Sequence, residues 1–395
     1  MTAKELRVSV IAVSAFLFTL QVIALCRGVP VAIEGQADFR YLYTAGYMAR
    51  THGLNLYDRE TNRQLQNALV SRDGAARVLE VPAYEALLFL PISFLKYRPA
   101  YIAFFAANLG LLGLSIRTLR PYLDKLERVW WWLPGVVVVC FFPTVVALFQ
   151  GQDSIILLTL MLASAVAFYR GRDLDAGVFL GLTLFKFQFA VPIALLFLFW
   201  RRWRLSAGFL VTGVAVAVLS LLLAGVSGLR ACAQSFLSWS AAPFAVERMN
   251  FGTPVPVIPN LYCLIHALAG PLVSPSIVVG ATVVCSTVLL GWAATRTANF
   301  ALAILVALLV SAHGTISDAV LLIIPVAMVL DARLTVDTGT SRLWSRNLAS
   351  MLFVAPSICF LAGLHYCLLA PLMLGLLMPL RFTSSDSLPA TSGAN

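Results

Sequence analysis

The sequence predicts an all-α integral membrane protein, a polytopic bundle of about 12 transmembrane or half-membrane helices. Its 395 residues are 60% hydrophobic and 12% charged, whereas a soluble domain carries about 25% charged residues. Apolar runs recur from residue 8 to residue 380 and leave no room for a soluble domain. The net charge of +10 lies in short basic clusters between those runs. This pattern is typical of orientation in a bilayer, and it disfavours nucleic acid as a partner.

The first apolar run, from Val8 to Cys26, is longer than the hydrophobic part of a signal peptide, about 7–15 residues. We therefore expect it to be an uncleaved transmembrane helix. A spanning helix needs about 20 apolar residues, and clear candidates follow at 99–116, 130–149, 154–169, 205–226, 273–293 and 299–312. Shorter or merged runs cover 175–200, 318–330 and 348–381.

Two of the merged runs are predicted to fold back on themselves. The run 175–200 lies between the basic flanks "YRGRD" and "FWRRWR", and the positive-inside rule places both flanks in the cytoplasm. That requires two short helices with a turn near Lys186. The run 348–381 likewise breaks near "LHYC" and ends at Arg381. Both termini are then cytoplasmic.

The predicted outer side consists of a long loop (27–98), a tight turn (150–154), a second long loop (227–272) and the turn 311–318. We expect residues 1–382 to form a single membrane domain, with 27–98 as its outer catalytic loop. Residues 383–395 have the composition of a disordered cytoplasmic tail. The seven cysteines form no CxxC pair. The sequence does not decide whether Cys232 and Cys263 form a disulfide.

The stretch "GQADFRYLYTAGYMARTHGLNLYD" begins the first outer loop. As a helix it places Phe39, Tyr43 and Tyr47 on one face, beside a face of small residues that allows another helix to approach closely. We expect an interfacial helix here. Asp38 at its start is suited to be an N-cap. It is equally suited to be a general base, because a helix N-terminus keeps a carboxylate ionised.

Further polar residues of interest fall on the same predicted side. Lys186 and Gln188 lie inside an apolar run, where a lysine is costly and is by default a functional candidate. The alternative for Lys186 is snorkelling to the interface. His313, in "VSAHGTISD", is a candidate for binding an anionic group. The alternative is that it is an interfacial residue with its hydrogen bonds satisfied. Gln152, in "QGQDS", belongs to a turn that reaches the same side.

The pair Asp173 and Asp175 in "RDLDAG" forms a DxD pattern, which we interpret as a helix cap in a short cytoplasmic turn. No P-loop, GxSxG, HExxH or dinucleotide fingerprint occurs in the sequence. An ATP-driven pump and a hydrolase of the soluble type are therefore disfavoured.

In order along the chain, five segments resemble the landmarks of glycosyltransferase family 87, the DUF2029 group of GT-C membrane enzymes. They are the Asp38 stretch, "YEALLFLPISFL", "GQDSIILLTLMLAS", "LFKFQFAVPIALLFLFWRRWR" and "SAHGTISDAVLLIIP". The resemblance runs from about residue 30 to residue 330. Two departures occur: the family's Lys-Pro-Gln is Lys186-Phe187-Gln188 here, and its Ser-Pro is Ser311-Ala312.

The resemblance implies a GT-C-like bundle that moves a hexose, with mannose as the expected sugar, from a polyprenyl-phosphate donor to a lipid or glycan acceptor, with inversion. It implies Asp38 as the general base. Donor phosphate would be bound by Lys186, His313 and Gln188, and substrate by Arg40, Tyr41, Tyr43, Tyr57 and Gln152, with no metal and no other cofactor. The tyrosines serve equally well as interfacial anchors.

These features predict a multi-pass protein of the inner (plasma) membrane, a monomer among membrane lipids, with its active site on the periplasmic or extracytoplasmic face. One alternative is a transporter or lipid flippase, which is expected to show two related halves with polar residues at the membrane midplane. Another is a non-catalytic scaffold, which would leave Lys186 unexplained.

Overall fold

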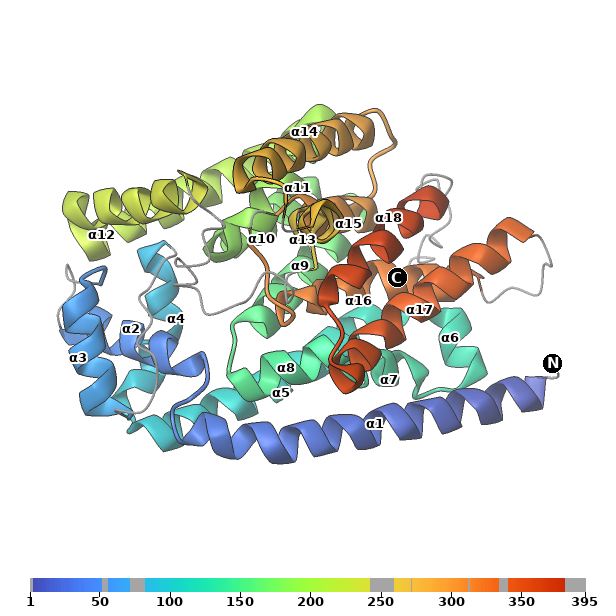
Figure 1. Cartoon of the computed structure of the whole chain (residues 1–395), viewed down its shortest axis with the longest axis horizontal. Helices are drawn as coiled ribbons and strands as arrows, with labels where there is room; N and C mark the ends of the chain where they lie inside the picture. Colours follow the sequence, from blue (N-terminus) through green and yellow to red (C-terminus); the bar gives the residue numbers. More distant parts are fainter. Residues whose placement is uncertain are drawn as a thin grey trace, which may run out of the picture.

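The structure is a computed structural model, and it describes residues 3–51, 56–71, 82–241, 259–270, 272–311, 313–333 and 340–380. Within these ranges all regular elements are helical (Figure 1). The α-helices are α1 (Ala3–Ile33), α2 (Phe39–Thr51), α3 (Arg59–Leu69), α4 (Ala86–Phe89), α5 (Tyr97–Leu119), α6 (Asp124–Val129), α7 (Leu133–Val139), α8 (Phe142–Gln150), α9 (Ser154–Tyr169), α10 (Asp173–Leu182), α11 (Phe187–Phe199), α12 (Trp203–Ala241), α13 (Leu261–Ala269), α14 (Pro275–Ala294), α15 (Phe300–Val310), α16 (Ile323–Arg333), α17 (Thr340–Ala362) and α18 (Leu369–Leu380). Short 3₁₀ turns join several of them: η2 (Ala83–Glu85), η3 (Pro91–Phe94), η4 (Arg120–Tyr122), η5 (Thr183–Lys186), η8 (Asp318–Leu322) and η9 (Tyr366–Leu368).

Each predicted apolar run forms helix in the structure. By length and composition, five of the described helical stretches can cross a membrane, or six if the α7–α8 pair, bent by 54°, counts as one. The remaining runs form shorter apolar helices, so the predicted total of about 12 stays a prediction. Not every apolar run faces lipid. Residues Phe300–Leu309 of α15 are all buried inside the bundle, which accounts for an apolar sequence without periodicity.

The run 175–200 folds back as predicted. It consists of α10, the turn η5 and α11, with Lys186 at the last position of the turn. Taken alone, Asp173–Phe199 is long enough to be one span. However, Arg202 just beyond α11 pairs with Asp173 at the start of α10 (Nη1–Oδ2, 3.5 Å). The two ends of the run therefore lie together, and it forms a hairpin rather than a single crossing. The predicted break near "LHYC" is likewise confirmed, since η9 separates α17 from α18.

Hydrogen bonds join the segments predicted to be cytoplasmic. Arg170 Nε donates to Tyr122 Oη at 3.0 Å. Asp331 Oδ1 accepts from the backbone N–H groups of Lys125 and Leu126 at 2.8 and 2.9 Å. The chain start and α6 lie at this same end of the molecule, whereas α2, α3 and α4 cap the opposite end (Figure 1). The grouping of segments predicted from charge is therefore present in the fold.

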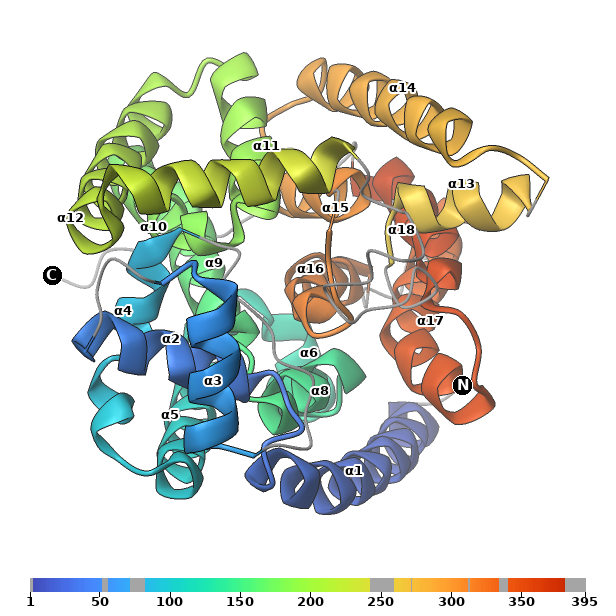
Figure 2. The same cartoon turned by 60° about the vertical axis from the view of Figure 1, so that its left-hand side comes forward.

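The first long loop carries helices, as predicted, and they pack on the bundle. Phe39 and Tyr43 of α2 lie against Tyr97 and Tyr101 of α5. The small-residue face is used as well, since a Cβ added at Gly46 would lie 2.5 Å from the Phe89 carbonyl oxygen of α4. Figure 2 shows α2, α3, α4 and the start of α5 gathered beside one end of α1.

Cys232 and Cys263 do not form a disulfide with each other in the structure. Cys263 of α13 is buried and packs on Cys367 of η9. Cys232 of α12 is hydrogen-bonded to Tyr57. Both Cys232 and Cys263 are free thiols in the structure. The predicted tail, 383–395, lies outside the described residues.

Candidate active site

A tight turn after α8 positions the centre of the site. Gly151 ends α8 in the left-handed conformation (φ 61°) that glycine adopts without strain. It also leaves space for α2, because a Cβ on Gly151 would lie 2.7 Å from the Cβ of Phe39. The turn thus brings the start of α2 against the start of α9. As a result, Gln152 Nε2 donates a hydrogen bond to Asp38 Oδ2.

Lys186 lies in a buried ion-pair network next to this turn. Its Nζ is 3.1 Å from Asp153 Oδ1 and 3.3 Å from Asp318 Oδ1, and the Lys186 side chain is 10% exposed. Lys186 therefore does not snorkel to the surface. Its ammonium is compensated inside the protein by two carboxylates, as a buried charge requires.

Asp318 is the most firmly held of these carboxylates. Ser154 Oγ donates to Oδ1 at 2.8 Å, and Thr315 donates to Oδ2 through its N–H and its Oγ1, both at 3.0 Å. Burial alone would raise the pKa of Asp318, but Lys186 and these hydrogen bonds hold it below the usual value. His313 is half-buried and acts in the same direction on the pKa of Asp318. His313 is thus within electrostatic range of Asp318.

A further acidic residue, Glu85 of η2, belongs to the same cluster and was not singled out from the sequence. It is 1% exposed. Burial, followed by the neighbouring Asp153 carboxyl, raises its pKa well above the usual value. The signal was present in the sequence, because Glu85 is the single acidic residue of "YEALLFLPISFL".

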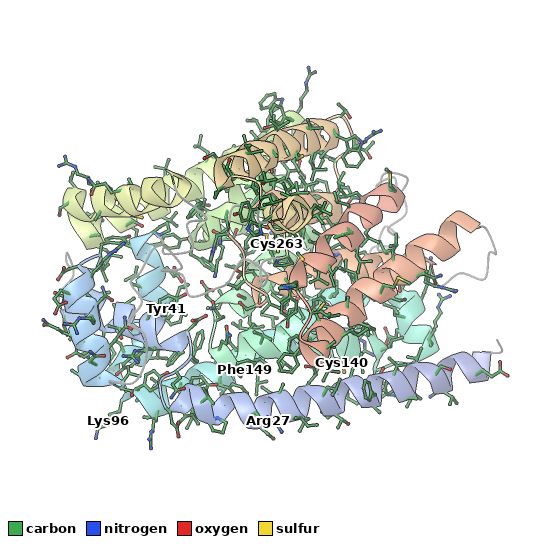
Figure 3. All side chains as sticks on the ribbon, viewed as in Figure 1. Arg27, Tyr41, Lys96, Cys140, Phe149 and Cys263 are labelled. Carbon is green, nitrogen blue, oxygen red and sulfur yellow. The ribbon has the colours of Figure 1, made fainter. Side chains whose placement is uncertain are left out.

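Tyr41 of α2 links the two parts of the site. Its hydroxyl is within electrostatic range of Lys186 and of the Asp38, Asp153 and Glu85 carboxyls. Burial raises the pKa of this hydroxyl well above 10, so it is a neutral hydrogen-bond donor. Figure 3 labels Tyr41 on the first outer loop, where that loop meets the central helices.

The other predicted residues lie in packing contacts or at the edge of the network. Arg40 is buried and donates through Nη2 to Asn67 Oδ1 at 3.0 Å and to the Ser71 carbonyl at 2.6 Å, which ties α2 to α3. Tyr43 Oη donates to the Leu95 carbonyl at 2.8 Å. Tyr57 packs near Gly228 of α12. Gln188 is half-buried in the first turn of α11. Their substrate contacts stay predictions.

The Asp residues of the DxD pattern form ion pairs at the start of α10, but the predicted helix cap is wrong, because Arg172 occupies the N-cap position and α10 has no side-chain cap hydrogen bond. Asp173 and Asp175 begin α10. Asp175 pairs with Arg172 at 2.6 Å, and Asp173 pairs with Arg202 across the hairpin. These contacts lie at the hairpin's open end, away from the Lys186 turn.

Among known proteins, the family model of glycosyltransferase family 87 matches residues 82–325, which is more than half of the chain. The chain therefore belongs to glycosyltransferase family 87. The match includes Glu85, Gln152, Asp153, Lys186 and Asp318 and begins after Asp38. No curated protein and no solved structure matches the chain significantly.

Proposed function

We propose that this member of glycosyltransferase family 87 moves a hexose from a polyprenyl-phosphate donor to a lipid or glycan acceptor. Mannose is the proposed sugar. The transfer is proposed to take place at the extracytoplasmic face of the inner membrane. The observation that carries the proposal is the contact between Gln152 and Asp38, which holds a half-exposed carboxylate beside the buried Lys186 network. A base and a cation side by side are what such a transfer requires.

Asp38 is proposed as the general base. Its carboxylate takes the proton of the acceptor hydroxyl while that oxygen attacks the anomeric carbon. The bond from that carbon to the phosphate oxygen breaks, and polyprenyl phosphate leaves with the electron pair. A single displacement of this kind inverts the anomeric carbon. Gln152 orients the carboxylate through its amide N–H, which corresponds to the positioning that general-base catalysis depends on.

Lys186 is proposed to stabilise the leaving phosphate. An ammonium group has three N–H bonds, and two carboxylates lie within ion-pair distance of Nζ. The remaining donor capacity of the ammonium is assigned to the donor phosphate. Because Asp153 and Asp318 fix the ammonium before the donor arrives, little reorganisation is needed when charge develops. Tyr41, His313 and Gln188 are the additional donors proposed around the same phosphate.

The proposal is tested with the full-length protein in lipid nanodiscs. Radiolabelled polyprenyl-phosphate-mannose is supplied together with a crude lipid extract of the source cell, and nucleotide sugars are supplied in parallel. We expect label to enter a new product from the lipid-linked donor alone. Transfer from a nucleotide sugar, with none from any polyprenyl-phosphate hexose, would contradict the proposed donor class while leaving the transferase class intact.

A further inference from the structure

Two buried carboxyls meet at the Lys186 network without a donor between them. Glu85 is 1% exposed and Asp153 is 0% exposed. Their carboxyl groups lie within hydrogen-bonding distance of each other. Among the described residues, no hydrogen-bond donor serves Glu85 Oε2 or either carboxylate oxygen of Asp153, although Asp153 Oδ1 is in ion-pair contact with Lys186.

Ionised carboxyls only accept hydrogen bonds, so two of them in contact leave buried acceptors unsatisfied and like charges adjacent. Both problems disappear if one of the two carries a proton and donates it to the other. Two carboxyls that share one site behave in this way in general, because both cannot ionise together.

We propose that Glu85 and Asp153 share one proton in the resting enzyme, and that Glu85 is thereby a positioning residue that fixes the Asp153 carboxylate against Lys186. Glu85 is the proton's main site because Asp153 is the carboxyl that faces the ammonium. This inference rests on the proposed function only in assigning Lys186 to the donor phosphate.

The charges around the pair favour the shared proton. Lys186 is a single ammonium in ion-pair contact with the Asp153 and Asp318 carboxyls and within electrostatic range of the Glu85 carboxyl. With all three ionised, the cluster would carry two uncompensated negative charges and would repel a phosphate. One retained proton removes half of that excess. Among the described residues, the tyrosine hydroxyls of Tyr41, Tyr57 and Tyr84 are also near Glu85, and burial keeps them neutral.

The segment that carries Glu85 is held by two hydrogen bonds of the neighbouring Tyr84, and neither involves the Glu85 carboxyl. The backbone N–H of the neighbouring Tyr84 donates to Ser220 Oγ of α12 at 3.2 Å, and the Tyr84 hydroxyl donates to the Leu182 carbonyl at the end of α10 at 3.2 Å. A Glu85→Gln substitution should therefore leave η2 in place.

The direct test is infrared spectroscopy of the full-length protein in nanodiscs at neutral pH, which needs no turnover. Difference spectra between wild type and each variant are recorded for E85Q and for D153N, with E60Q as the control. Glu60 is an exposed carboxylate of α3 paired with Arg63. We expect wild type to contain a protonated-carboxyl band that E85Q loses and that D153N shifts, since D153N removes the carboxylate that accepts the shared proton while Glu85 stays buried. E60Q should retain the band.

An unchanged protonated-carboxyl region in both E85Q and D153N would overturn the proposal, whether or not the protein transfers sugar. The reverse combination, loss of the band in E85Q and its shift in D153N with no transfer from any lipid-linked donor, would support the shared proton and reject the proposed function. The two failures are therefore distinguishable.

A kinetic test then separates positioning from mere packing. Since Gln can also donate a hydrogen bond to Asp153, E85Q should keep the donor KM of wild type within about twofold at neutral pH. Wild-type kcat/KM should fall at alkaline pH as the proton is lost, and E85Q should lack that fall. E85L cannot donate, and its donor KM should rise at least tenfold. An alkaline fall that persists unchanged in E85Q would contradict the proposed role.

Discussion

At the scale of single residues, the ion pairs of Lys186 offset the cost of burying its charge and also hold its ammonium in place. A buried ammonium is expensive unless it is paired, and this one lies within 3.1 and 3.3 Å of two buried carboxylates. Removing one partner of such a network leaves uncompensated charge behind. The same network holds the ammonium between two carboxylates, which suits its proposed contact with a phosphate.

Replacing Lys186 by Met should destabilise the protein by about 3–5 kcal/mol, because two carboxylates lose their counter-ion. It should also abolish saturable donor binding. Thermal unfolding and donor binding in nanodiscs measure the two effects. The matched control is K96M, which changes an exposed lysine just before α5 and should alter stability by less than about 0.5 kcal/mol.

A double variant separates stability from binding. In K186M/D153N one of the two orphaned carboxylates is gone, so part of the lost stability should return while donor affinity stays absent. Recovery of both together would show that Lys186 acts only through folding.

How much of the site could be predicted depends on the type of residue. Lys186 was identified because a lysine in an apolar run has few explanations. Asp153 and Asp318 were not assigned as its partners, because an Asp at a helix start is already explained as a cap. Glu85 was missed because the segment before α4 reads as a loop, and only the folded chain brings it to Asp153. Long-range pairings of this kind leave no local pattern.

At the scale of elements, the α10–α11 hairpin positions Lys186, and α10 is held by close contact with α12. A Cβ on Gly177 would lie 2.0 Å from the Leu205 carbonyl oxygen, and one on Gly208 would lie 2.2 Å from the Leu174 carbonyl oxygen. Backbone atoms cannot rotate away as side chains can. The two helices therefore depend on glycine at both positions, as closely packed membrane helices often do.

The substitution Gly177→Ala should destabilise the protein by about 1–3 kcal/mol, the usual cost of inserting atoms into a packed interface. It should also lower transfer activity, since α10 leads directly to η5. The control is Gly110→Ala in α5, where nothing lies within 4 Å of an added Cβ. Alanine there should be neutral or stabilising by about 0.5–1 kcal/mol. Equal stability changes for the two variants, read from thermal unfolding in detergent, would argue against the proposed packing.

At the scale of the whole molecule, the fold separates into two ends. One end joins the segments around Tyr122, Arg170, Asp331 and the open end of the hairpin. The other joins the first outer loop, the Gly151 turn, the Lys186 turn and the start of η8. The helix α1 runs from the first end to the second (Figure 1), and its 31 residues cover about 46 Å, more than a membrane core.

The grouping of segments into two ends could be predicted because basic residues mark short cytoplasmic loops. The number of crossings could not, because apolar content does not distinguish a helix in lipid from one in the bundle interior. The contrast between α15, buried throughout, and α14, largely exposed, illustrates this.

This arrangement predicts the result of labelling single cysteines with a membrane-impermeant thiol reagent in a cysteine-free background. Arg170→Cys and Arg204→Cys should react from the same side, and Glu34→Cys at the end of α1 should react from the other. All three positions are exposed in the structure. Reaction of 170 and 204 from opposite sides would mean that Asp173–Phe199 crosses the membrane once.

The account as a whole depends on Asp38 as the base. The most direct measurement compares wild type, Asp38→Asn and Asp58→Asn in nanodiscs for sugar transfer and for donor binding. Asp58 is the matched control, because it caps α3 in the same loop and is fully outside the Lys186 network. We predict that D38N lowers turnover at least 10²-fold with donor binding within about twofold, while D58N keeps most of its turnover. Turnover of D38N close to that of wild type would contradict the central claim.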